Sequence, residues 1–167
     1  MNISNNQYSP ILPPWKFYTL SLFTWGFYQV PWAHKQWKYL KERENLNINP
    51  WLRAIFLPLY IYDLSQKAFA LAEEEGYRKK YSPLQTTIFY WIFFFLLWWG
   101  GDTLSWVGLF SFLPLLRVLK TMNYYWQRQL PDLPVNESFT VREMIWIGFG
   151  VMLWLMIIYS GISGSSS

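Results

Sequence analysis

The stretch that decides the fold class is LQTTIFYWIFFFLLWW, residues 84–99, which contains no charged residue. Ser82 and Pro83 precede it, and Ser-Pro-Leu-Gln has the form of a capping box with proline at the first helical position. Gly100 and Gly101 follow in a tight turn. Because aromatic residues lie all round this run, the sequence predicts a membrane-spanning helix that contacts protein on one face and lipid on another.

Two similar runs lie towards the C-terminus, at residues 103–119 and 144–161. The second run follows Thr140 and Glu143, which have the spacing of another capping box. Residues 120–140 are polar and contain prolines, so we expect a loop there. The sequence therefore predicts three helices that cross, or nearly cross, a membrane.

Two shorter apolar segments precede these runs. Residues 17–33 would form a helix of about 25 Å, which is marginal for a hydrocarbon core of about 30 Å. Gly26 and Pro31 weaken that helix further, so the segment either spans or re-enters the membrane. Residues 54–64 contain a proline and an aspartate, which favours an interfacial or re-entrant helix.

A helix with two different faces is predicted over residues 32–44. At 100° per residue, one arc of this helix is apolar and aromatic, and it contains Trp32, Ala33, Trp37, Tyr39 and Leu40. The opposite arc is mainly basic, with His34, Lys35, Lys38, Lys41 and Glu42. This pattern is typical of a helix that lies on a membrane surface.

The composition agrees with a membrane protein. Of the 167 residues, 53% are hydrophobic, 22% are aromatic and only 14% are charged, whereas charged residues make up about 25% of an ordinary soluble domain. We predict an all-α polytopic membrane protein, a helical bundle with one membrane domain over residues 15–160. A polar leader, residues 1–14, precedes this domain, and residues 161–167 resemble an appended flexible linker.

The charged residues indicate an orientation. If residues 54–64 do not cross, 13 of the 14 Lys and Arg residues fall in polar segments on one side of the membrane, and only Lys16 lies apart. The positive-inside rule then makes the polar loops cytoplasmic. The net charge of +4 is explained by this basic excess, and we expect no nucleic-acid partner.

The region from Thr24 to Phe56 resembles a family of small bacterial multi-pass inner-membrane proteins without an established activity. The resemblance rests on the Thr-x-Gly-x-Tyr turn that begins at Thr24, a helix rich in Trp and Lys, and the Pro-x-x-Arg-Ala stretch that begins at Pro50. It covers residues 15–65 well and the remainder by hydropathy alone. It implies a location in the bacterial inner membrane and assigns no catalytic residue.

Several chemistries have weak support in this sequence. It contains no cysteine and one histidine, which excludes thiolate chemistry, iron–sulfur clusters and sites built on several histidines. Tyr62-Asp63 and Gly100-Gly101-Asp102 resemble the motifs of intramembrane aspartyl proteases, but the orientation puts these carboxylates on opposite sides. The hydroxyls of Ser21, Thr24 and Ser111 lack the glycine-flanked elbow of a serine hydrolase.

The sequence favours a non-enzymatic membrane protein that acts by association, as an accessory or scaffold subunit in contact with anionic lipid. Its partners are membrane lipids and either itself or another membrane protein, and no metal or other cofactor is assigned. A small homo-oligomeric channel or transporter is the alternative, and a membrane enzyme is third. The candidate lipid-binding residues are Lys35, Lys38, Lys41, Arg43 and Arg53, and a possible intramembrane polar site contains Gln29, Asp63 and Lys67.

Overall fold

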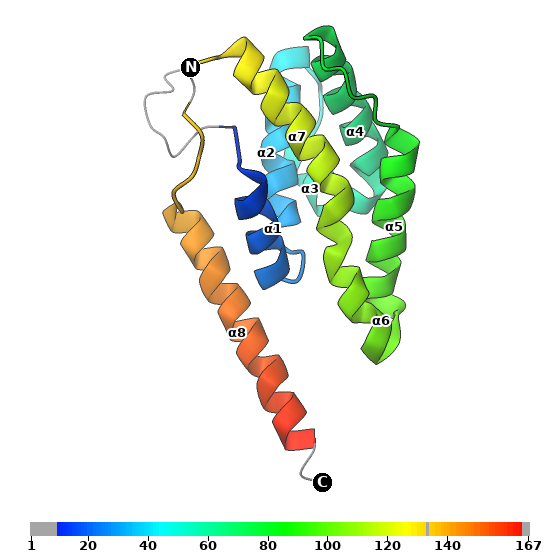
Figure 1. Ribbon diagram of the computed structural model, residues 1–167, viewed down its shortest axis with the longest axis vertical. Coiled ribbons are helices and arrows are strands. Elements are labelled where there is room, and N and C mark those ends of the chain that lie inside the picture. Colours follow the sequence, from blue (N-terminus) through cyan, green and yellow to red (C-terminus); the bar gives the residue numbers. More distant parts are fainter. Residues whose placement is uncertain (1–9, 133, 165–167) are drawn as a thin grey trace.

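The computed structural model describes residues 10–132 and 134–164, and for residues 102, 103 and 161–164 it describes the backbone alone. Residues 1–9 of the expected leader and residues 165–167 of the expected C-terminal tail therefore lie outside the described residues, while the backbone of residues 161–164 is helical. Within the described part the chain is all-helical and contains no strand, as the sequence predicts (Figure 1). The helices are α1 (Pro14–Phe23), α2 (Gln29–Glu44), α3 (Pro50–Ile55), α4 (Leu57–Glu74), α5 (Pro83–Trp99), α6 (Gly101–Gly108), α7 (Phe112–Gln129) and α8 (Val141–Gly164), with the short 3-10 helix η2 (Leu109–Ser111) before α7.

The first apolar segment does not form one helix. The chain leaves α1 at Thr24, turns sharply, and runs back as α2 (Figure 1). Trp25 and Gly26 have φ angles of 53° and 83°, a left-handed conformation that glycine adopts at little cost. Thr24 closes the turn, because its hydroxyl donates to the carbonyl of Leu20 and accepts from the amide of Tyr28. Residues 17–33 therefore form a helical hairpin.

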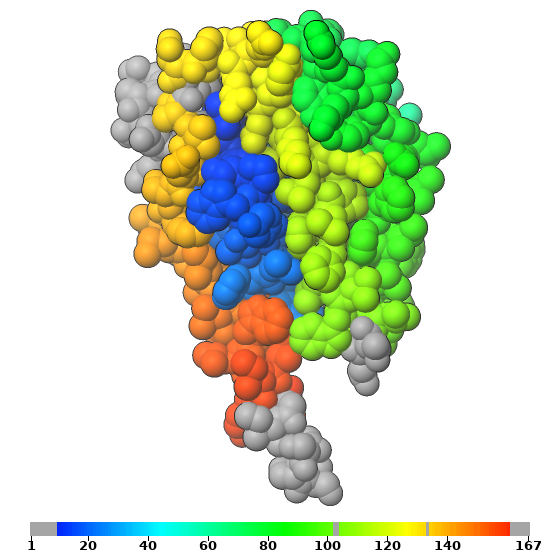
Figure 2. All heavy atoms as spheres, in the orientation of Figure 1, coloured from blue at the N-terminus to red at the C-terminus, as the bar shows by residue number. Residues whose placement is uncertain are grey.

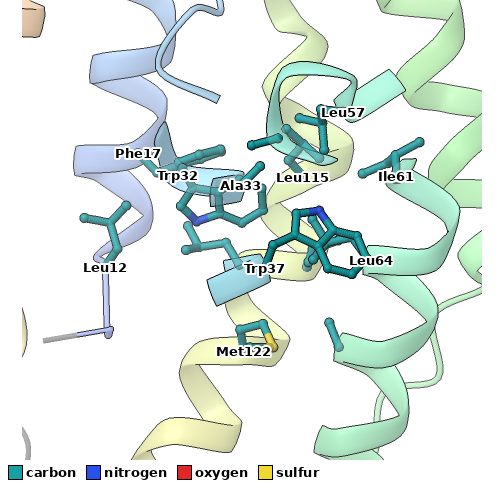
Figure 3. Close-up of a cluster of buried hydrophobic side chains, with 14 of the residues drawn as sticks. Leu12, Phe17, Trp32, Ala33, Trp37, Leu57, Ile61, Leu64, Leu115 and Met122 are labelled. Carbon is teal, nitrogen blue, oxygen red and sulfur yellow. The ribbon is translucent and has the colours of Figure 1, made fainter. Parts of the chain in front are cut away.

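The expected aromatic face of α2 exists, but it lies inside the protein. Trp32, Ala33, Trp37 and Leu40 are buried. Figure 3 shows the Trp37 side chain among residues of α4 and α7, such as Leu64 and Met122. This face contacts protein where the sequence suggested lipid, since α1, α4 and α7 cover it.

The second short segment is divided as well. Asn49 caps α3 by accepting from the amides of Trp51 and Leu52. α3 ends at Ile55, and α4 begins at Leu57 and continues well beyond residue 64. A proline in the first turn of α4 suits a helix start, where its missing amide hydrogen is not needed.

The predicted loop at residues 120–140 is shorter than expected. α7 continues to Gln129, and its buried face contains Val118, Met122 and Tyr125. An apolar stripe among polar residues is enough to hold the second half of α7 against the bundle. α5, which packs against α4, α6 and α7, has nearly the bounds predicted for residues 84–99.

Two stretches of the described chain are long and apolar enough to cross a membrane. They are Leu104–Gln129, which begins within α6 and continues through η2 and α7, and Val141–Ser160 within α8. The first is half buried in the bundle. Most of α8, by contrast, is not covered by other helices, and its main contact is with α1. Figure 2 shows the C-terminal end of α8 extending beyond the other helices.

The contact between α1 and α8 depends on Gly150. A Cβ atom at residue 150 would lie 2.5 Å from the carbonyl oxygen of Phe23, which is too close for any side chain. Glycine therefore lets the two backbones approach each other directly. Gly148, on the same helix, has nothing within 4 Å of its Cβ position.

We expect Gly150→Leu to separate α8 from α1 and to lower the free energy of unfolding by about 1–3 kcal/mol, as overpacking usually does. Gly148→Leu is the matched control, because it adds the same side chain in open space. Thermal unfolding of the purified protein in mild detergent measures both. Equal stability of the two variants would contradict this packing.

Candidate functional site

A buried ion pair joins distant parts of the chain. The Lys16 ammonium on α1 lies 2.7 Å from Glu143 Oε2 on α8, and the Lys16 side chain is fully buried. The same ammonium donates to the backbone carbonyl of Ser138 at 2.6 Å and to the side-chain oxygen of Asn136 at 2.9 Å. Lys16 thereby fixes both α8 and the loop that precedes it.

Glu143 has additional partners that place the start of α8 beside α2. Its carboxylate accepts from the Tyr28 hydroxyl at 3.2 Å and from the Thr140 amide at 2.8 Å. The Glu143 amide donates in turn to the Thr140 hydroxyl, which completes the predicted capping box. The sequence indicated this cap but neither its ion pair with Lys16 nor its bond to Tyr28.

Two of the five predicted lipid-binding residues, Arg43 and Arg53, contact other side chains of the protein. The Arg53 guanidinium lies over the Trp37 and Tyr60 rings, 4.5 and 4.9 Å from their centroids, and 3.4 Å from Asp63. Arg43 lies over the ring of Tyr125 and near Glu74. Lys38 and Lys41 are exposed on the outer side of α2, and Lys35 is half-buried.

Arg142 joins this basic surface from the start of α8. Its charge lowers the pKa of His34 and of Lys35, although burial is the larger cause for both. Burial reduces the Lys35 pKa to about 8, while the Glu143 carboxylate opposes that decrease. We call His34, Lys35, Lys38 and Arg142 the basic patch. Sequence reasoning missed Arg142, since only folding places it beside α2.

Trp51 extends the basic patch towards the apolar surface. The His34 imidazole stacks on the Trp51 ring with centroids 4.0 Å apart, and Trp51 is itself about half exposed. An exposed tryptophan next to a polar side chain suits the boundary between lipid headgroups and acyl chains. His34 therefore belongs to the basic patch, and within the described residues no group of three or more acidic or histidine side chains could hold a metal ion.

The three residues of the predicted polar site have separate partners, although Asp63 and Lys67 are four residues apart on α4. Asp63 pairs with Arg53, and Lys67 pairs with Glu44. The Gln29 amide instead donates to the Ser111 hydroxyl at 2.9 Å, inside the apolar part of the bundle. Asp63 has an arginine partner on α3, and the side chain of Asp102 lies outside the described residues, so the structure gives no support to an aspartyl dyad.

Polar segments that are distant in sequence meet at one end of the bundle. The ends of α2 and α4 are joined by Lys67 with Glu44 and by Arg43 with Glu74. The Tyr124 hydroxyl of α7 donates to the carbonyl of Glu75, just after α4. The polar segments that contain most of the Lys and Arg residues, which the positive-inside rule assigns to one side of the membrane, are therefore neighbours in the structure.

No protein-family model, curated protein or solved structure matches this chain. The resemblance to small bacterial inner-membrane proteins therefore stays a prediction. In its described residues the chain is all-helical, with two candidate membrane spans and clustered aromatic side chains.

We expect Lys16→Met to lower the free energy of unfolding by about 3–5 kcal/mol, because it leaves the Glu143 carboxylate buried without its cation. The double variant Lys16→Met/Glu143→Gln removes that charge and keeps hydrogen-bonding capacity at residue 143. It should therefore be more stable than Lys16→Met alone. Denaturant titration measures both, and a loss below about 1 kcal/mol for Lys16→Met would contradict the role of this pair.

Proposed function

We propose that this chain is a multi-pass integral membrane protein that acts by association, as an accessory or scaffold subunit, and binds anionic lipid at the basic patch. The observation that supports this most strongly is the division of its surface into an apolar part and a polar part. Large apolar side chains are exposed on α1, α3, α5, α6 and α8 and at the starts of α4 and α7, and three more, Leu130, Val135 and Phe139, are exposed between α7 and α8.

The boundary between the two parts is sharp on helices that extend through both. On α4 the last large exposed apolar side chain is Tyr62, and on α7 it is Leu113. Beyond these residues α4 exposes Glu73 and Glu74, and α7 exposes Lys120 and Arg128, among others. An apolar surface of this extent is costly in water but suits a bilayer.

This division favours one orientation. The polar end contains the ends of α2, α4 and α7 with most of the Lys and Arg residues, and the turn at Gly100 lies at the opposite end. By the positive-inside rule, we assign the polar end to the cytoplasm of a bacterial cell. The hairpin of α1 and α2 enters the apolar part and returns, so Lys16 also belongs on the cytoplasmic side.

The position of the basic patch supports the lipid-binding part of the proposal. Lys38 and Arg142 are exposed, and Trp51, which stacks on His34, belongs to the apolar surface. Each Lys or Arg near an anionic leaflet contributes about 1 kcal/mol of attraction. A phosphate at the basic patch would complement its cations while the acyl chains of the lipid follow the uncovered faces of α3 and α8.

Association is the second part of the proposal. α8 has little cover from the rest of the chain, and many of its apolar side chains are exposed, such as Ile145, Leu155 and Met156. Native mass spectrometry of the protein, extracted gently from its own membrane, reads copy number, protein partners and retained lipid together. A monomer without partner or anionic lipid would contradict the proposal.

The orientation can be tested because the chain has no cysteine. We expect Lys79→Cys to react with a membrane-impermeant maleimide only in inverted vesicles, and Gly101→Cys to react in intact spheroplasts. The Cβ position of residue 101 has nothing within 4 Å, so a cysteine fits there apart from its left-handed backbone. The reverse pattern of labelling would overturn the assignment.

We expect Lys35→Glu/Lys38→Glu to lower retained anionic lipid at least about tenfold, from about 1 kcal/mol lost for each cation and further repulsion. Lys79→Glu reverses an exposed charge away from the basic patch and should retain lipid normally. Native mass spectrometry with a defined phosphatidylglycerol mixture measures this, and equal retention by both variants would count against the site.

Lipid retention should also depend on pH. The Lys35 pKa of about 8 means that this side chain loses its charge as the pH rises from 7 to 9, so retention should fall over that range. A bound anionic headgroup moves the change to higher pH without altering its sign. Lys35→Arg keeps its charge throughout and should flatten the profile, which distinguishes Lys35 from other titrating groups.

A further inference from the structure

A cavity of about 240 Å³ lies in the apolar part of the bundle. Its walls are the turn after α1, the junction of α3 and α4, the α5 face from Tyr90 to Trp98, and Ser111. Phe27, Ile55 and Trp98 are among the lining residues that are also exposed on the apolar surface. The cavity therefore opens sideways, towards the surface that we assign to lipid.

Three interruptions of helical structure meet at this cavity. They are the left-handed turn at Trp25 and Gly26, the break between α3 and α4 at Phe56, and the 3-10 helix that ends at Ser111. Irregular backbone inside a bilayer is tolerated where it is buried in protein or lines a cavity. In membrane transport proteins, interrupted helices of this kind commonly form ligand sites.

The cavity has one polar wall. Gln29 is buried, and its amide nitrogen donates to the Ser111 hydroxyl at 2.9 Å. Gly26 leaves space for this amide, because a Cβ atom at residue 26 would lie 3.0 Å from the Gln29 nitrogen. Among the described lining residues of the cavity, none is Asp, Glu, Lys or Arg, so the wall offers hydrogen bonds without charge.

These features specify a kind of ligand. An uncharged lining excludes a charged group, since an ion would lack a partner in an apolar environment. The lining is mainly aromatic and aliphatic, which favours an apolar body, and the Gln29–Ser111 pair can bind one hydroxyl or carbonyl group. The volume is slightly below the roughly 300–1,000 Å³ of pockets for drug-sized ligands, so the ligand or its inserted part is small.

We infer that the cavity binds an uncharged amphiphile taken from the bilayer, with its apolar body among the aromatic side chains and its single hydroxyl or carbonyl group at Gln29 and Ser111. This inference rests on the proposed embedding of the chain in a membrane. It is independent of the basic patch, which contributes no residue to the cavity lining.

A diazirine-bearing octanol tests this inference in the full-length protein in lipid nanodiscs. Photolabelling followed by peptide mass spectrometry should modify residues of the cavity lining, such as Val30 and Leu97, and excess unlabelled octanol should suppress that labelling. The lipid-facing side of α5, including Ile92, should also be labelled, but without saturation. Cavity labelling that is absent or that does not saturate would overturn the inference.

Two variants of similar size locate the site. Val30→Trp fills the cavity and should abolish its saturable labelling, whereas Ile92→Trp adds the same side chain on the exposed face of α5 and should leave the labelling unchanged. Equal effects of the two would contradict binding in this cavity. If Val30→Trp does not fold, the competition by octanol in the unmodified protein still decides the outcome.

The polar wall is tested separately by Gln29→Leu. This variant should weaken saturable labelling by the octanol probe, but it should not weaken labelling by a diazirine-bearing octane that lacks the hydroxyl. Equal loss with both probes would contradict the role of Gln29. Labelling of the α5 outer face without cavity labelling would reject the ligand site alone, whereas absence of both would also count against membrane embedding.

Discussion

The buried ion pair between Lys16 and Glu143 is the contact on which the arrangement of the helices depends. A buried ammonium is tolerated only with partners, and Lys16 finds them on α8 and in the loop at Asn136 and Ser138. Glu143 also binds Tyr28, at the entrance to α2. These contacts hold the start of α8 beside the α1–α2 hairpin, and Gly150 then lets α8 follow α1 closely.

The position of α8 bears on the proposed function, because Arg142 precedes Glu143 and lies on the side of α2. There it joins His34, Lys35 and Lys38 in the basic patch, and Trp51 connects the patch to the apolar surface. The same ion pair that orders the bundle therefore assembles the surface that we propose binds anionic lipid. Loss of the Lys16–Glu143 ion pair is therefore expected to disturb the basic patch as well as the packing of α8.

The cavity in the apolar part of the bundle lies where helices are interrupted. Gly26 adopts the left-handed backbone of the turn after α1, which glycine does at little cost. Pro58 lies in the first turn of α4, where its missing amide hydrogen is not needed. Packing brings the two interruptions together beside Ser111, and the space between them becomes a cavity with one polar wall.

The sequence alone determined the helical class, the bounds of α5, the capping box at Thr140 and the two faces of α2, because periodicity, capping and composition act between near neighbours. Only the tertiary structure decided that the aromatic face of α2 lies in the core and that Arg53 lies over Trp37. It also paired Lys16 with Glu143 and Gln29 with Ser111, across long separations in sequence. Helical spacing shows which side chains share a face, but what that face contacts depends on the packing of distant segments.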